Sequence, residues 1–233
     1  MTTSEPKPVA AEIGRALRLV EFNLHVARFA HASWYADELR TQMLAAGMLD
    51  SQGRIQQRVE AQISSWLLHE LGLRDEMDWQ MSEPQKKLWL LDGPSLQRLA
   101  HELALAMHRD WLAQTIDAAS VRALQAKVDR QALRFVVEEV PDGAFHYQSA
   151  AVDFQADSAS DLSLKLTALG ARTLLALLQP AWHAVRVRAQ LYFDRSAGFG
   201  EVPAFESAHC DRALELICGW LIPRRFPEWA WCF

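Results

Sequence analysis

Long apolar runs are missing from this sequence of 233 residues. No stretch reaches the ~18 uncharged apolar residues that a membrane-spanning helix needs. Residues 1–8 carry acid and proline where a signal peptide has basic residues followed by an apolar run. We therefore expect a soluble, cytoplasmic protein that does not insert directly into a membrane, with residues 1–8 as a disordered tail.

Cysteine is scarce, and all three cysteines lie from residue 210 onward, at Cys210, Cys218 and Cys232. An odd number at irregular spacing excludes a disulfide framework and favours a reducing compartment. Together with His209 they could in principle supply four zinc ligands. Cys210 and Cys218 are, however, separated by more residues than the two to four of a typical zinc-binding pair. We therefore predict no metal and no cofactor.

Recognisable catalytic motifs are also absent. The sequence contains neither a Gly-x-Ser-x-Gly motif nor a Gly-x-Gly-x-x-Gly phosphate loop. The tripeptide from His108 to Asp110 is similar to the catalytic loop of protein kinases, but Thr115 occupies the position where that loop needs asparagine. His69 and His101 each precede a glutamate, and neither has a second histidine one helical turn later. We therefore expect no catalytic residues and no enzymatic activity.

The formal net charge is -5, which excludes a general electrostatic attraction to nucleic acid or acidic lipid. Basic residues nevertheless gather in two stretches. They are Arg122, Lys127, Arg130 and Arg134 in the first stretch and Arg186, Arg188 and Arg195 in the second. Without interleaved aromatic residues they predict no nucleic-acid site. They form either a patch for an acidic protein surface or ordinary solvated helix faces.

Tryptophan, in contrast, is abundant, with nine residues in a composition that is otherwise typical of globular proteins. Trp residues serve as bulky packing groups or as anchors of protein interfaces. Two places combine them with charge: Trp79 with Asp75, Glu76, Asp78 and Glu83, and Trp229 and Trp231 with Arg224, Arg225 and Phe226. We predict that these are protein-binding surfaces. The alternatives are that Trp79 folds inward and that the C-terminal aromatics cover the core.

An apolar helical pattern between residues 95 and 139 is the most regular feature of the sequence. Its apolar positions recur every three or four residues, at Leu96, Leu99, Leu103, Met107 and Trp111 and again at Val121, Leu124, Val128, Ala132, Phe135 and Val136. Ser95 is a candidate N-cap, residues 115–117 interrupt the pattern, and Pro141 ends it. The sequence therefore predicts a mainly α, compact multi-helix fold around a central helical hairpin.

Other apolar patterns predict helices over residues 9–27, 33–46, 55–71, 84–91, 162–178 and 206–221. The first is expected to bury Ile13, Leu17 and Val20. Residues 185–194 fit both a strand and a helix, and we favour a helix because a lone strand needs a partner. Any strand is expected only at 144–156 or 185–194. We expect one domain over residues 9–233, with a mobile connection near 141–160.

Several segments together resemble the SctK family, the YscK-type cytoplasmic accessory proteins of bacterial type III secretion systems. The similar segments, in order, are Trp66-Leu67-Leu68, Leu71-Gly72-Leu73, the leucine-rich stretch to His108 with Trp111-Leu112, Val121-Arg122-Ala123-Leu124, Leu133-Arg134-Phe135, Gly170 with Leu174-Leu175, Leu221-Ile222-Pro223, and Trp229. The chain departs from the family pattern in a longer N-terminal part and over residues 142–160.

This resemblance implies a non-enzymatic adaptor of the sorting platform. Such an adaptor links the cytosolic domain of an inner-membrane ring protein to the pod protein that recruits stalk and ATPase components, and it is associated with bacterial virulence. The alternatives that the residues leave open are a helical protein-binding scaffold outside secretion and an enzyme without recognisable motifs.

Overall fold

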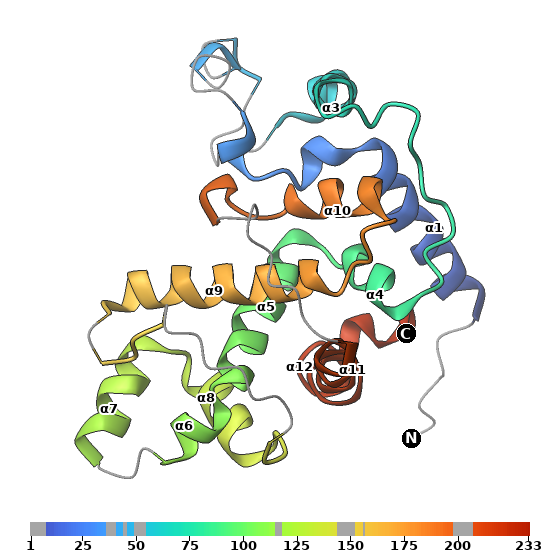
Figure 1. Ribbon diagram of the computed structural model, residues 1–233. Coiled ribbons are helices and arrows are strands. Elements are labelled where there is room, and N and C mark those ends of the chain that lie inside the picture. Colours follow the sequence, from blue (N-terminus) through green and yellow to red (C-terminus); the bar gives the residue numbers. More distant parts are fainter. Residues whose placement is uncertain are drawn as a thin grey trace, which may run out of the picture. The chain divides into compact units, whose positions relative to one another are not determined.

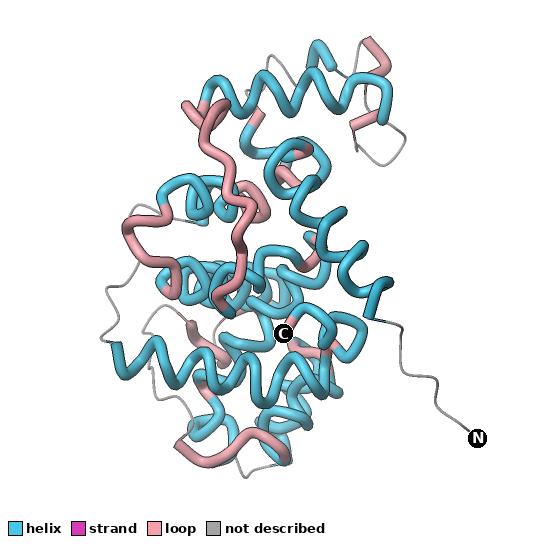
Figure 2. The backbone as a smooth tube through the Cα atoms, turned by 90° about the vertical axis from the view of Figure 1, so that its right-hand side faces the viewer, coloured by secondary structure: helices cyan, strands magenta, loops and turns pink. Residues whose placement is uncertain are grey.

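The computed structural model describes residues 8–35, 41–43, 46–48, 55–114, 118–143, 152–155, 157–197 and 207–233. The chain divides into two compact units. Unit 1 comprises Met1–Gly93, Leu178–Phe199 and Trp231–Phe233, and unit 2 comprises Pro94–Leu177 and Gly200–Ala230. The regular elements of the described residues are helices, and no strand appears among them (Figure 2). The predicted mainly α fold is therefore confirmed.

Unit 1 contains the helical elements of the N-terminal part and one helix from later in the chain. They are α1 Pro8–Leu24, the 3-10 turns η1 Val26–Arg28 and η2 Ala32–Trp34, α3 Gln57–Glu70, α4 Pro84–Lys87, η3 Leu88–Leu90, α10 His183–Gln190 and η4 Arg195–Ala197. Figure 1 shows α10, in orange, beside the blue segment that follows α1. A hydrogen bond from the His31 amide to the Leu191 carbonyl, 2.7 Å long, joins these two segments.

Aromatic rings form the centre of unit 1. Phe29 stacks on Tyr192 with ring centroids 4.1 Å apart, and the fully buried Trp89 meets Phe193 edge to face at 6.3 Å. The Tyr192 hydroxyl donates a hydrogen bond to the carbonyl oxygen of Trp89. Because large rings bury much apolar area at little conformational cost, this cluster holds α10 against the segments around α1 and α4.

Unit 2 is built around α5 and α9. Its elements are α5 Gly93–Met107, α6 Arg109–Gln114, α7 Ala118–Lys127, α8 Arg130–Glu138, α9 Ala159–Ala176, α11 Ser207–Leu216, the π-helical turn η6 Ile217–Leu221, α12 Ile222–Arg225 and most of the 3-10 segment η7 Pro227–Cys232. Figure 1 shows α5 passing across α9. No helix in the described parts of either unit is long and apolar enough to cross a membrane.

The predicted hairpin is present, but each of its two helices is divided. The first is divided at His108 into α5 and α6, and the second is divided before Asp129 into α7 and α8. Asp129 accepts a hydrogen bond from the amide of Ala132 and so caps a new helix within the predicted one. Ser95 is not an N-cap, since α5 begins at Gly93 and the Ser95 hydroxyl instead accepts the indole N–H of Trp229.

The C-terminal helix does not end at residue 221 as predicted. It passes through the π-helical turn into α12, which contains Pro223 near its start. Proline has no N–H to donate back along the helix. The carbonyl of Gly219 accepts Nη1 of Arg224 instead, at 3.1 Å. A side chain thus replaces the backbone donor that Pro223 lacks, and the helix continues.

Two amphipathic helices are rotated relative to the prediction. In α1 the predicted core residues Ile13, Leu17 and Val20 are 56%, 65% and 37% exposed. In α3 the buried face contains Glu60 and Ser64 together with Leu67 and Leu68, while the apolar Trp66 is 39% exposed. The polar residues of α3 can be buried because each finds a partner. The Glu60 carboxylate binds His25 and Arg28, and the Ser64 hydroxyl accepts the amide of Ala27.

Of the remaining predictions, the helix at 185–194 is confirmed as far as Gln190, where α10 ends, and the strand alternative there is wrong. The predicted helix at 33–46 is described only at its 3-10 start and at residues 41–43. Residues 1–7 of the predicted tail, and 144–151 and 156 of the predicted connection, lie outside the described residues. Mobility of that connection and a single domain over residues 9–233 stay predictions.

Candidate functional site

The candidate site is the loop from Leu73 to Glu83 in unit 1, which we call the Trp79 loop. Gly72 ends α3 with a φ of +67°, a conformation that favours glycine, and Pro84 begins α4. Leu73 is fully buried and Met81 is 4% exposed, so both ends of the loop are anchored in the core. Trp79, between these anchors, is 47% exposed. The alternative that Trp79 folds inward is therefore wrong.

Asn23 of α1 fixes the middle of this loop. Its side chain is fully buried, its Nδ2 donates to the carbonyl oxygen of Asp78 at 2.8 Å, and its Oδ1 accepts the amide of Asp78 at 3.0 Å. Nδ2 also donates to the carbonyl of Leu19. One side chain thus satisfies both backbone groups of the residue before Trp79, as an adjacent β-strand would. The backbone at Trp79 is therefore held to the last turn of α1.

Lys86 of α4 holds the same part of the loop through its side chain. Its Nζ lies 2.7 Å from Oδ2 of Asp78 and 3.5 Å from Oε2 of Glu83, and it lies over the Trp182 ring. The Lys86 side chain is only 8% exposed. An ammonium so close to the Asp78 carboxylate neutralises that acid. Asp78 is therefore a structural residue of the loop and not a free surface charge.

Arg188 of α10 provides a third attachment. Although we predicted it to be part of a basic surface, it is fully buried, so that prediction is wrong for this residue. Its Nη2 donates to the carbonyl oxygen of Leu73 at 3.2 Å. Burial lowers the pKa of Arg188 to about 10, against the opposing effect of the Glu76 and Asp78 charges. A buried cation beneath the loop thus attracts the acids above it.

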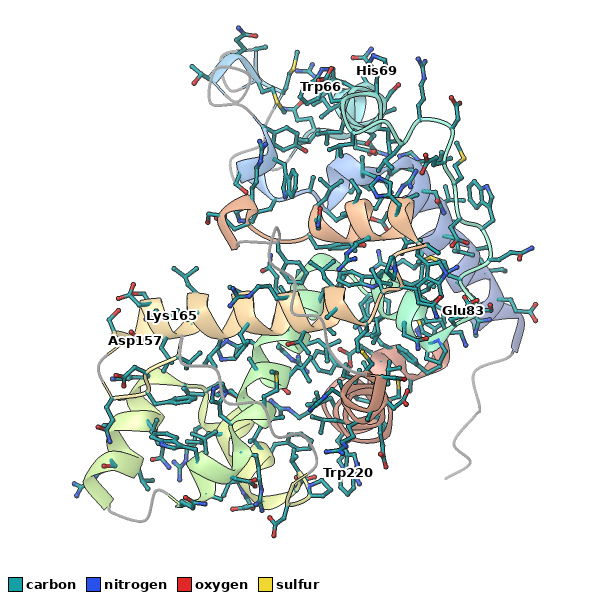
Figure 3. All side chains as sticks on the ribbon, viewed as in Figure 1. Trp66, His69, Glu83, Asp157, Lys165 and Trp220 are labelled. Carbon is teal, nitrogen blue, oxygen red and sulfur yellow. The ribbon has the colours of Figure 1, made fainter. Side chains whose placement is uncertain are left out.

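The outer surface of the loop consists of the groups that these attachments leave in solvent. Asp75 and Glu76 are exposed, Met77 is 42% exposed, and Trp79 is exposed on the same loop. Figure 3 shows a second exposed tryptophan, Trp66, on the outward side of α3. Trp66 lies within a regular helix, and it therefore offers a natural comparison for Trp79.

The predicted site in the C-terminal tail has a different arrangement. The Arg225 guanidinium makes two 2.8 Å hydrogen bonds to the carboxylate of Glu102, which is 2% exposed. In unit 2, Trp229 donates its indole N–H to Ser95, and in unit 1 Trp231 packs against Gly14. Most of these groups are engaged inside their own unit. This favours the alternative that the tail covers the core, with Arg224 as its exposed cation.

The remaining predicted basic residues are not brought together on one element. Arg122 on α7 and Arg130 on α8 are exposed and belong to unit 2, whereas the half-buried Arg186 lies on α10 in unit 1. The sequence signal that was missed is Asn23. A polar residue inside an apolar helical stretch suggests a specific buried partner.

The described residues contain no group of three His, Cys, Asp or Glu side chains placed to hold a metal ion. Cys210 and Cys218 are half-buried, and Cys232 is buried, which raises its thiol pKa to about 11. A thiol with so high a pKa is almost entirely protonated near neutral pH, and the thiolate is the form that attacks substrates or binds metals.

Comparison with known proteins gives one result. A family model described as YOP proteins translocation protein K (YscK) matches residues 17–142, which is more than half of the chain. The match includes the Trp79 loop and begins in α1, so most of the N-terminal part fits the family, contrary to our expectation of a departure there. The later segments that carried the resemblance, from Gly170 onward, lie outside it. No curated protein and no solved structure matches the chain.

Proposed function

Because the chain belongs to the YscK family, whose members are type III secretion proteins, we propose that it is a non-enzymatic adaptor of the secretion sorting platform. In this role it links the cytosolic domain of an inner-membrane ring protein to the pod protein. It is then held at the cytoplasmic side of the membrane by protein contacts alone. The family membership and the geometry of the Trp79 loop support this proposal.

The observation that carries the proposal is the fixed Trp79 loop. A solvent-exposed tryptophan on a free loop would lose conformational entropy when a partner binds it, and that loss weakens binding. Here Asn23, Lys86 and Arg188 hold the loop from three different helices before any partner arrives. A partner can therefore bury the indole at a lower entropic cost.

The composition of the loop also suits a protein contact. Tryptophan is enriched among residues that dominate binding energy, and such residues work best when charged groups surround them and exclude water from the contact. Asp75 and Glu76 supply such charges on the same loop as Trp79. We therefore assign Trp79 as the anchor and the two acids as its rim.

The test replaces Trp79 with alanine and compares this variant with Trp66→Ala. Both tryptophans are exposed in unit 1, so the comparison controls for loss of surface tryptophan. Binding of each purified full chain to the purified ring cytosolic domain and to the pod protein is measured by calorimetry, and each melting temperature is recorded. We expect Trp79→Ala to lose ~2 kcal/mol or more of affinity for one partner, about thirtyfold, with little change in melting temperature.

Wild-type affinity of Trp79→Ala for both partners would show that the loop is not the interface. Absence of binding by the wild-type chain to either protein would overturn the adaptor role itself. Trp66→Ala is expected to bind both partners as the wild type does, because His69 and Arg74 lie beside Trp66, where the rim assigned to Trp79 is acidic.

A further inference from the structure

Helix α1 exposes its apolar face. Ile13, Leu17 and Val20 are 56%, 65% and 37% exposed, and Ala16 is exposed as well. These four residues follow the spacing i, i+3, i+4, i+7, so they form one continuous stripe along the helix. Exposed apolar residues scattered singly are ordinary, but a complete helical stripe marks a binding surface.

The opposite face of α1 explains this orientation. The arginines on this face are half-buried and have partners within unit 1. Nη2 of Arg15 donates to the carbonyl oxygen of Trp231, and Arg18 forms an ion pair with Glu21. The buried Asn23 lies one turn after Val20, near the C-terminal end of the stripe, and binds the backbone of the Trp79 loop there. Phe22 lies on the face opposite the stripe and is 1% exposed, so its burial and the Arg15 contact set the rotation of α1 and leave the apolar stripe in solvent.

The charges that border the stripe are acidic. Glu12 is exposed beside Ile13, near the start of the helix. At the other end, the hydrogen bonds of Asn23 hold the Trp79 loop against the helix, and Asp75 and Glu76 are exposed on that loop. Among the described residues, none of these three acids forms an ion pair, whereas both arginines of α1 have partners within unit 1. A complementary surface must therefore be apolar along its centre and basic at its ends.

We propose that the stripe formed by Ile13, Ala16, Leu17 and Val20 binds an amphipathic α-helix of another protein, with lysine or arginine bordering its apolar face. A helix is the partner that matches a stripe with i, i+4, i+7 spacing, because its own apolar residues recur with the same period. The acidic border disfavours an anionic membrane surface as the occupant. This inference rests on the exposure and charge of α1 and does not depend on the adaptor role.

The test places the photo-crosslinking residue benzoylphenylalanine at Leu17 in the full chain. A matched control carries it at Leu164 of α9, which is 68% exposed. Both chains are produced in bacteria that express the complete secretion system, and the crosslinked segments are identified by mass spectrometry. Thermal melting of each purified chain establishes that it is folded before crosslinking.

We expect position 17 to capture a helical segment with an apolar stripe and basic borders, and position 164 not to capture it. Reversing charge with Glu12→Lys and Asp75→Lys should lower the crosslinking yield at position 17 at least fivefold. Capture of an acidic segment, of lipid or of a second copy of this chain would overturn the proposal, and so would no capture at all. A basic helix from a protein outside secretion would support the α1 surface while contradicting the adaptor role.

Discussion

Replacing Gly170 with alanine tests a close contact between two helices of unit 2. Gly170 lies in α9 against the backbone of α5, and a Cβ atom added there would be 1.8 Å from the carbonyl oxygen of Ala100 and 2.4 Å from its carbonyl carbon. Both of these neighbours are backbone atoms, so no side-chain rotation can relieve the overlap. The two helices would have to separate by roughly 1.5 Å to reach ordinary van der Waals contact.

The expected magnitude combines two opposing effects. In a helix without such a contact, alanine is ~1 kcal/mol more favourable than glycine. Overpacking of a tight core typically costs ~1–3 kcal/mol and can cost more. Separation of α5 from α9 would also loosen the leucines between them, which are no more than 2% exposed: Leu99, Leu103, Leu166, Leu169 and Leu174. We therefore expect Gly170→Ala to destabilise the protein by about 2 kcal/mol or more.

The assay is urea denaturation of Gly170→Ala beside the control Gly219→Ala. An added Cβ at Gly219 would meet nothing within 4 Å, so the control is expected to be neutral or slightly stabilising. The two substitutions are chemically identical and differ only in their surroundings. If Gly170→Ala also stabilised the protein, by ~1 kcal/mol, the close packing of α9 on α5 would be refuted.

Two further predictions concern buried polar groups of unit 1. Asn23→Ala should remove the protection of the Asp78 amide in hydrogen exchange. It should also lower the free energy of unfolding by about 1–3 kcal/mol, because the amide and the carbonyl of Asp78 both lose their partner. Unchanged exchange at Asp78 would show that Asn23 does not hold the loop. Burial tends to raise the pKa of Glu60, but hydrogen bonds and charges from His25 and Arg28 outweigh it and lower this pKa below its ordinary value of 4.5. The stabilisation from Glu60 is therefore full above pH 4.5 and is lost as the pH falls through the lower pKa of the folded protein. Denaturation at a series of pH values should show the stability difference between wild type and Glu60→Gln shrinking across that interval, and a constant difference would contradict the assigned pKa direction.

The sequence by itself determined that the fold is mainly helical and where several of the helices end. Gly72 and Pro84 mark the two limits of the Trp79 loop because their backbone preferences are local properties. The apolar positions Leu96, Leu99 and Leu103 are buried as the periodicity predicted. The sequence also placed an acidic tryptophan-containing loop between two helices, which is the candidate site.

Only the tertiary structure decided how each helix is rotated. The apolar stripe of α1 predicts a buried face, yet on the opposite side Phe22 is buried and Arg15 binds the carbonyl oxygen of Trp231. Periodicity records which residues share a face and contains no information about distant polar partners. For the same reason the sequence could not distinguish the buried Arg188 from the exposed Arg130.

The same distinction applies to the candidate site. Its aromatic and acidic composition was readable in the sequence, but its fixed shape depends on contacts between residues far apart in the chain. Asn23 of α1 is hydrogen-bonded to Asp78 of the loop, and Arg188 of α10 is hydrogen-bonded to Leu73. Those hydrogen bonds exist only after the helices have packed. The sequence therefore determined the chemical groups that the site presents, and the packing of unit 1 determined that Trp79 is held in solvent by buried polar side chains.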